Sequence, residues 1–218
     1  MKKNILKGIY AITPDGLNEE TLYKKVYKLL EKGVNLLQYR DKLRSPKEKL
    51  IIAKELRNIC NKFDSLLIIN DDAKLAKKIE ANGVHLGQKD MPCEEARNIL
   101  GSDSIIGISC QNDLGLAFKA QSKGADYVAF GSLFRTKSKT DVLDCSLEEL
   151  TSFVKEIKIP SVAIGGINHE NCGQLITAGV DYIATISSVW GFPSGPKDAV
   201  NMFHQIFHQH SSTDIASI

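Results

Sequence analysis

The chain has 218 residues, 28 basic and 26 acidic side chains, a formal net charge of +2 and 43% hydrophobic residues. This length fits one large domain or two small ones, with a core that needs no disulfides. The balanced charge argues against a nucleic-acid-binding protein, and the apolar content argues against a disordered chain. A compact enzyme or small-molecule binder remains.

The chain carries no sign of secretion or membrane insertion. Its cysteines are odd in number and widely spaced, which argues against a disulfide framework or a zinc site and favours reduced thiols. Residues 1–13 lack the cleavage pattern of a signal peptide, and no uncharged stretch is long enough for a transmembrane helix. We expect a cytoplasmic protein that binds neither a membrane nor nucleic acid; its oligomeric state, a homodimer for example, is left open.

Short apolar runs alternate with charged stretches along the chain. The runs are rich in β-branched side chains, as buried parallel strands are, and the charged stretches space their apolar residues as amphipathic helices do. Ser45 and Ser146 each begin a capping-box pattern at a helix start. In chain order the expected elements are a strand at 8–13, a helix around 22–30, a strand at 35–39, a helix around 50–56, a strand at 66–69, a helix around 75–79, strands at 83–86, 105–108 and 127–130, a helix around 147–157, and strands at 161–164 and 182–186.

Eight strand–helix units in about 200 residues predict a small (β/α)8 TIM barrel, a single α/β domain over residues 1–210. Residues 211–218 are polar and unpatterned, and we expect them to form a frayed tail. A doubly wound open sheet is the alternative architecture. It is less favoured because eight units are many for such a sheet and because no GxGxxG motif follows the first strand.

The active site of such a barrel forms at the C-terminal ends of its strands, so the polar residues there carry the functional signal. After the second strand, Gln38, Arg40 and Lys42 fall on one face by the period-two geometry of a strand. Two cations and an amide suit an anionic ligand such as a phosphate. The alternative is a solvated strand end at which a cation pairs with Asp41.

Two aspartates follow the third and fourth strands. Asp72 is well placed to cap the next helix, which leaves Asp71 without a structural task, and Asp90 lies just before the helix start at Met91–Pro92. Carboxylates on adjacent barrel loops are suitable ligands for a Mg²⁺ ion held against substrate phosphates. Helix capping is the alternative for this pair.

Later loops contain further phosphate-binding signals. The loop from Gly131 to Ser146 mixes hydroxyl and basic side chains, as a phosphate-gripping lid or an exposed basic loop would. Gly165–Gly166 follows the seventh strand and Ser187–Ser188 the eighth, where TIM barrels commonly bind phosphate. Two anion sites, one metal site and no obvious nucleophile indicate displacement of pyrophosphate rather than covalent catalysis.

Seven short motifs span nearly the whole chain, between Tyr10 and Ser188. They are Gln38-x-Arg40-x-Lys42, Ile69-Asn70-Asp71, His85-Leu86-Gly87-Gln88-x-Asp90, Ile106-Gly107-x-Ser109, Gly131-x-x-Phe134-x-Thr136-x-Ser138-Lys139, Ala163-Ile164-Gly165-Gly166-Ile167 and Ile186-Ser187. Each motif is weak alone, but the ordered set is specific. The set resembles that of the thiamine-phosphate synthase family.

The resemblance implies a transferase reaction between two phosphorylated small molecules. In it, (4-amino-2-methyl-5-pyrimidinyl)methyl diphosphate and 4-methyl-5-(2-phosphooxyethyl)thiazole give thiamine phosphate and pyrophosphate. The residues implied for the pyrimidine diphosphate are Gln38, Tyr39, Arg40, Asp41, Lys42, Asn70, Ser109 and Lys139. Those implied for the thiazole phosphate are Thr136, Lys137, Ser138, Gly166, Ile186 and Ser187. Asp71 and Asp90 would bind one Mg²⁺, and the catalytic residues would be Arg40, Lys42, Ser109 and Lys139.

One loop departs from the family pattern. The family's lid usually reads close to Phe-Pro-Thr-x-Thr-Lys, whereas here Arg135 replaces the proline and Ser138 the second threonine. Two other functions are open: the thiazole tautomerase of the same superfamily, and a non-catalytic barrel that binds a phosphate ligand. Neither would need the full set of pyrophosphate and Mg²⁺ residues, so the retained set favours the synthase.

Overall fold

A computed structural model describes residues 7–134 and 146–211 of the chain. Within these residues, eight parallel strands pair in chain order, and the first strand pairs with the last to close a barrel. The strands are β1 (Gly8–Ile12), β2 (Leu36–Tyr39), β3 (Leu66–Asn70), β4 (Gly83–Leu86), β5 (Ile105–Ser109), β6 (Tyr127–Phe130), β7 (Ser161–Ile164) and β8 (Tyr182–Thr185). The TIM barrel prediction is confirmed, and the open-sheet alternative is wrong.

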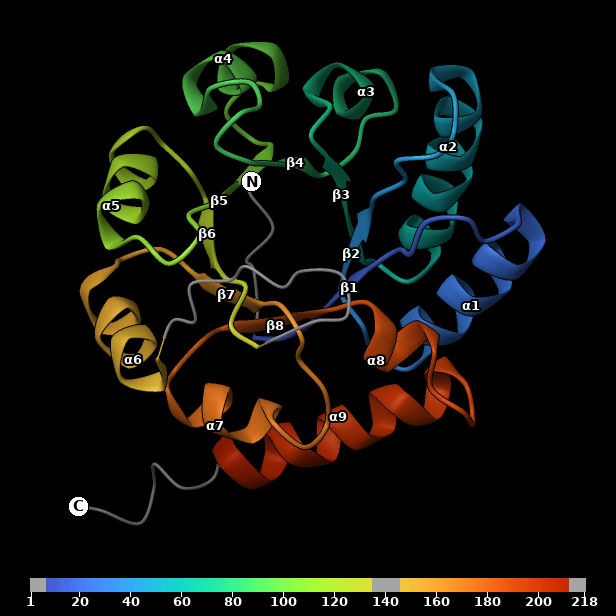
Figure 1. Cartoon of the computed structure of the whole chain (residues 1–218). Helices are drawn as coiled ribbons and strands as arrows, with labels where there is room; N and C mark the ends of the chain where they lie inside the picture. Colours follow the sequence, from blue (N-terminus) through green and yellow to red (C-terminus); the bar gives the residue numbers. More distant parts are fainter. Residues whose placement is uncertain (1–6, 135–145, 212–218) are drawn as a thin grey trace.

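The helices form a ring around the strands, as Figure 1 shows in a view along the barrel. They are α1 (Glu19–Glu31), α2 (Pro46–Lys62), α3 (Ala73–Lys78), α4 (Cys93–Leu100), α5 (Leu114–Ser122), α6 (Leu147–Glu156), α7 (Cys172–Thr177), α8 (Ser187–Trp190) and α9 (Pro196–Ser211). The predicted tail begins at the last residue of α9, and residues 212–218 lie outside the described part, so the domain boundary stays a prediction.

Local sequence signals start three of these helices. Both capping boxes form: the Ser45 N–H donates to the Glu48 carboxylate at 2.9 Å, and the Ser146 N–H donates to that of Glu149 at 2.8 Å. Asp72 caps α3 by accepting the Leu75 N–H at 2.8 Å. The cap predicted for Asp72 is therefore confirmed.

Side chains from the strands alternate between two apolar layers. One layer lies between the strands and the helices, and the other fills the barrel interior. On β2, Leu36 belongs to the interior layer, whereas Leu37 and Tyr39 belong to the outer one. This alternation directs Gln38 into the barrel, toward the mouth at which the strands end. Among the described residues, no helix is long and apolar enough to span a membrane.

Candidate active site

A chain of hydrogen bonds crosses the barrel interior beneath the mouth. The Gln38 amide nitrogen donates to the Tyr10 hydroxyl at 2.8 Å, and the hydroxyls of Tyr10 and Tyr127 are 2.8 Å apart. The Tyr127 hydroxyl lies 2.9 Å from Nδ1 of His85, and the His85 ring stacks on the Tyr127 ring. Gly107 makes room for this arrangement, because a Cβ there would lie 1.9 Å from Cζ of Tyr127.

This interior chain is uncharged at neutral pH. Burial lowers the pKa of His85 to about 4, with a small opposing effect from Asp90. Burial also raises the pKa of Tyr10 and Tyr127 well above the usual tyrosine value. His85 is therefore a hydrogen-bonded neutral histidine that forms part of the barrel lining.

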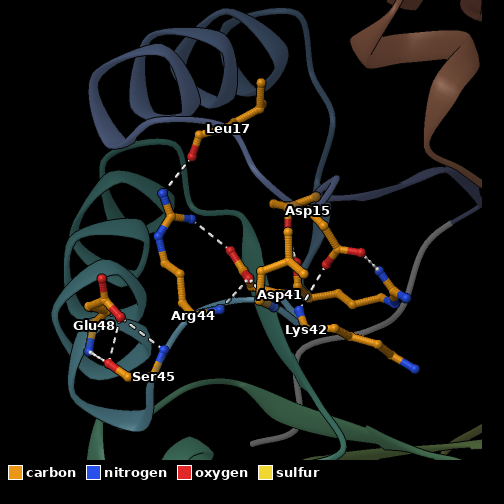
Figure 2. A network of polar contacts seen from close by, with 10 residues as sticks. Asp15, Leu17, Asp41, Lys42, Arg44, Ser45 and Glu48 are labelled. Atoms are coloured by element: carbon orange, nitrogen blue, oxygen red, sulfur yellow. Dashed lines mark hydrogen bonds and ion pairs between the residues drawn. The ribbon is translucent and has the colours of Figure 1, made fainter.

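The loop that follows β1 holds the Arg40 side chain and the Lys42 main chain, and Figure 2 labels Asp15 of this loop beside Lys42. Arg40 donates from Nη1 to Asp15 Oδ2 at 2.9 Å, and the Lys42 main-chain N–H donates to Asp15 Oδ1 at 2.8 Å. Thr13 accepts the Arg40 N–H and donates its hydroxyl to the Arg40 carbonyl, at 2.9 and 2.7 Å. Because β2 ends at Tyr39, these contacts rather than strand geometry set the position of Arg40.

Tyr39 and Asp41 both line a cavity at the ends of β2 and β3, and their place in the pyrimidine diphosphate set stays a prediction. Tyr39 packs in the outer layer and is only 3% exposed. Asp41 accepts the N–H groups of Leu43 and Arg44 and pairs with the Arg44 guanidinium at 2.6 Å. Burial opposes ionisation, but these donors lower the pKa of Asp41. The alternative, in which a cation of the predicted set pairs with Asp41, is wrong for Arg40, which pairs with Asp15, because Arg44 pairs with Asp41.

Asp71 and Asp90 come together, as expected from adjacent barrel loops. Burial and the neighbouring Asp90 carboxylate raise the pKa of Asp71, while Lys42 and Asn70 lower it. Asp71 adopts a left-handed backbone with φ of 63°, which is uncommon for a residue with a side chain and often marks a functional site. Asp90 accepts the Gly87 N–H at 2.7 Å and does not cap α4.

These two carboxylates suit a hard divalent cation. Two like charges held together are relieved by a positive ion, and Mg²⁺ commonly uses one or two protein carboxylates while water and phosphate supply its other ligands. No group of three or more His, Cys, Asp or Glu side chains gathers as a metal site within residues 7–134 and 146–211. A cavity of about 370 Å³ lies beside Asp71 of this pair, and Lys42 and Asn70 also line it.

A second cavity, of about 770 Å³, opens at the ends of β7 and β8, and Gly166, Ile186 and Ser187 all line it. Gly166 has φ of 64°, and a Cβ there would lie 2.8 Å from the Phe134 carbonyl oxygen. Ser109 ends β5, and its carbonyl accepts a hydrogen bond from the Gln88 amide at 2.6 Å. The predicted lid residues Thr136, Lys137, Ser138 and Lys139, with Arg135, lie outside the described residues.

A family model described as thiamine monophosphate synthase matches residues 9–189. The chain belongs to the thiamine-phosphate synthase family. The thiamine-phosphate synthase of Nitrosospira multiformis is 44% identical to it over 186 residues, which cover 85% of this chain and 80% of that protein. The same enzyme of Thioalkalivibrio sulfidiphilus is 42% identical over 195 residues, which cover 89% and 92%.

One solved structure gives the same assignment. Thiamine phosphate pyrophosphorylase of Pyrococcus furiosus matches with a TM-score of 0.82 and 36% identity over 95% of this chain and 98% of that one. A 3-hexulose-6-phosphate synthase matches with a TM-score of 0.70 at 15% identity, which shows a shared fold alone. The predicted thiamine-phosphate synthase family and the predicted class, a transferase of thiamine biosynthesis, are confirmed.

Several residues of the thiamine-phosphate synthase mouth were missed by sequence reasoning. Asp15 and Thr13 hold the Arg40 segment, and Tyr10, itself bonded to Tyr127, accepts from Gln38. Only Asp15 had a usable local signal, because the Thr13–Pro14–Asp15–Gly16 sequence is a typical turn directly after a strand.

Proposed function

We propose that this chain joins (4-amino-2-methyl-5-pyrimidinyl)methyl diphosphate to 4-methyl-5-(2-phosphooxyethyl)thiazole at the barrel mouth. The observation that carries the proposal is that Asp71, which interacts with Asp90 and Lys42, lines one cavity together with Lys42, while a glycine-lined cavity opens at β7 and β8. One cavity suits a diphosphate with its cation, and the other suits a phosphate that needs close backbone approach.

The pyrimidine diphosphate would bind at the ends of β2 to β5. Arg40 and Lys42 would hold the diphosphate oxygens, with Lys139 as a third cation from the lid. Asn70 and Ser109 would contribute hydrogen bonds, and Gln38 would meet the pyrimidine ring. The contact of Gln38 with Tyr10 supports this role, because it fixes the amide at the top of the barrel interior.

Asp71 and Asp90 would hold one Mg²⁺ against the diphosphate, and the raised pKa of Asp71 fits a site that gains from a nearby positive charge. When bound, the ion supplies positive charge that neutralises phosphate oxygens. The two carboxylates would hold the ion in place, and Lys42, which lowers the pKa of Asp71, would face the same ligand from the β2–α2 loop.

The reaction breaks one bond and forms another. The bond between the pyrimidine methylene carbon and the diphosphate oxygen breaks, and pyrophosphate leaves with the electron pair. Arg40, Lys42 and Lys139 stabilise the charge that grows on it. The aminopyrimidine stabilises the resulting cation, and the thiazole nitrogen donates its electron pair to the methylene carbon. The residues act by positioning and electrostatics, with no protein nucleophile.

The thiazole phosphate would bind across the mouth, at β7 and β8. Gly166 would let the backbone approach the phosphate, and Ser187, which begins α8, lines the same cavity. Thr136, Lys137 and Ser138 of the lid would close over it, together with Ile186. We further propose a cytoplasmic location, which suits the buried free thiols of Cys60, Cys110 and Cys172.

The test is a direct assay with pure protein, both substrates and Mg²⁺, which follows pyrophosphate and thiamine phosphate together. Asp71→Asn and Asp90→Asn should each lose Mg²⁺-dependent turnover by at least about a hundredfold while staying folded. Asp72→Asn is the matched control, since Asp72 caps α3 and should keep turnover. No product, or product that is indifferent to EDTA, contradicts the proposal. Isomerisation of a thiazole carboxylate phosphate would favour the tautomerase instead.

A further inference from the structure

We propose that Asp15 is a positioning residue that aims the Arg40 guanidinium at the diphosphate, an inference that rests on the function proposed above for Arg40. Asp15 lies on the β1–α1 loop and receives two hydrogen bonds from the β2–α2 loop. One comes from Arg40 Nη1 at 2.9 Å and the other from the Lys42 N–H at 2.8 Å. Figure 2 shows both bonds on the one carboxylate.

The local sequence holds Asp15 in place. Thr13 follows β1 and is bonded to both main-chain groups of Arg40, so the two loops stay in register beyond the last strand residues. Pro14 restricts the backbone before Asp15, and Gly16 supplies the φ of 80° with which the turn continues. The carboxylate is thus set by a stiff turn rather than by a flexible loop tip.

Arg40 needs such a partner. It lies past the end of β2, and a long arginine side chain without a partner samples many rotamers. With Nη1 bound to Asp15, the guanidinium plane is oriented and its other N–H groups are left for an anion. A second contact holds the same loops together at a distance from these cations: Arg44 donates to the Leu17 carbonyl at 2.5 Å and to Asp41 at 2.6 Å.

Whether removal of Asp15 weakens or strengthens anion binding distinguishes a positioning role from a purely electrostatic one. Asp15 brings a negative charge to a mouth that is proposed to bind an anion. If it acted only through that charge, its removal would strengthen anion binding. If it orients Arg40, removal weakens binding in spite of the more positive mouth, because the cation loses its fixed direction.

The experiment titrates pyrophosphate into wild-type protein and Asp15→Asn at saturating Mg²⁺ by calorimetry. The asparagine oxygen can still accept the Lys42 N–H, so the substitution removes the Arg40 contact selectively. We expect a Kd for pyrophosphate about tenfold higher and a matching rise in KM for the pyrimidine diphosphate. The KM for the thiazole phosphate should change less than about twofold. Equal or tighter pyrophosphate binding overturns the proposal.

Two further variants test the route of the effect. Glu48→Gln removes one negative charge at the start of α2 but has no contact with either cation, and it should leave the Kd unchanged. In an Arg40→Ala background, Asp15→Asn should add less than about a twofold effect, since the group it orients is gone. Two outcomes contradict positioning. In one, Glu48→Gln weakens pyrophosphate binding as much as Asp15→Asn does. In the other, the double variant raises the Kd by the product of the factors measured for the Asp15 and Arg40 single variants.

The titration needs no turnover, so the two proposals fail separately. Wild-type protein that binds pyrophosphate and shows the Asp15→Asn loss, yet makes no thiamine phosphate, contradicts the proposed function alone. Normal turnover with unweakened binding in Asp15→Asn contradicts the positioning role alone. Wild-type protein that does not bind pyrophosphate with Mg²⁺ contradicts the role of Asp15, and unfolding curves for each variant identify any that fail to fold.

Discussion

The hydroxyls of Tyr10 and Tyr127 lie 2.8 Å apart inside the barrel, although 117 residues separate them in the chain. They join Gln38 on one side to His85 on the other. Because Gln38 donates to Tyr10, the hydrogen bonds of the chain can all run the same way. Tyr10 then donates to Tyr127, and Tyr127 donates to Nδ1 of His85. A residue proposed to bind substrate is thereby anchored in the floor of the site.

Loss of the Tyr127 hydroxyl should destabilise the barrel. Tyr127→Phe leaves the Tyr10 hydroxyl and His85 Nδ1 without this buried partner, and we expect the free energy of unfolding to fall by about 2 to 3 kcal/mol. Urea denaturation measures it. Tyr182→Phe is the matched control, since that hydroxyl bonds Asn35 at a long 3.3 Å and should cost less. Equal losses of unfolding free energy in both variants would show that the hydrogen-bond chain through Tyr10 and Tyr127 does not stabilise the barrel more than the Tyr182 contact does.

Gly107 should tolerate no side chain. A Cβ at this position would lie 1.9 Å from Cζ and 2.3 Å from the hydroxyl of Tyr127, so Gly107→Ala must displace a fully buried ring. We expect a loss of more than about 3 kcal/mol in the free energy of unfolding, measured by urea denaturation. Gly115→Ala, on α5, is the control, because its Cβ would meet only the Asp113 carboxylate, at 3.1 Å. A Gly107→Ala protein as stable as that control contradicts the packing argument.

Much of this arrangement could be predicted because its signals are local. The capping boxes at Ser45 and Ser146, the cap at Asp72 and the alternation along β2 each depend on a few neighbouring residues. The meeting of Asp71 and Asp90 followed from the barrel itself, since the ends of adjacent parallel strands share one mouth.

The remaining contacts depend on partners that lie far away in the chain. The bond from Tyr10 to Tyr127 depends on the shear of the closed barrel, which no local pattern encodes. The family resemblance placed Asp41 in the substrate set, but no local pattern predicted that the N–H groups of its own turn and Arg44 would bind its carboxylate. Because β2 ends at Tyr39, the alternation of side chains along a strand does not apply to Arg40 and could not predict where its side chain lies.

His85 should make stability depend on pH in the acidic range. Above pH 6.5 the histidine is neutral in both states and contributes no pH dependence. Below pH 6.5, His85 binds a proton in the unfolded chain but stays neutral in the folded protein, where its pKa is about 4. The free energy of unfolding should therefore fall between pH 6.5 and 4, by about 2 kcal/mol at pH 5.

The measurement compares urea denaturation at pH 7 and pH 5 for wild-type protein and His85→Asn. Asparagine does not titrate, so the variant should lose less stability on acidification by about that amount. His204, whose pKa burial also lowers, acts in the same direction but is present in both proteins and cancels in the difference. Parallel pH profiles for the two proteins would contradict the assignment to His85.

Gly166 should govern affinity for the thiazole phosphate through both its backbone and its lack of a Cβ. Its φ of 64° strains an alanine, and the added Cβ would lie 2.8 Å from Cβ of Phe134. Gly195→Ala is the matched control: that glycine has φ of 92°, with nothing within 4 Å of its added Cβ, so it isolates the backbone cost of about 1 kcal/mol. Steady-state kinetics should show the KM for the thiazole phosphate about tenfold higher in Gly166→Ala and that for the pyrimidine diphosphate nearly unchanged. If Gly166→Ala behaves as Gly195→Ala does, in stability and in both KM values, the close approach at β7 has no part in phosphate binding.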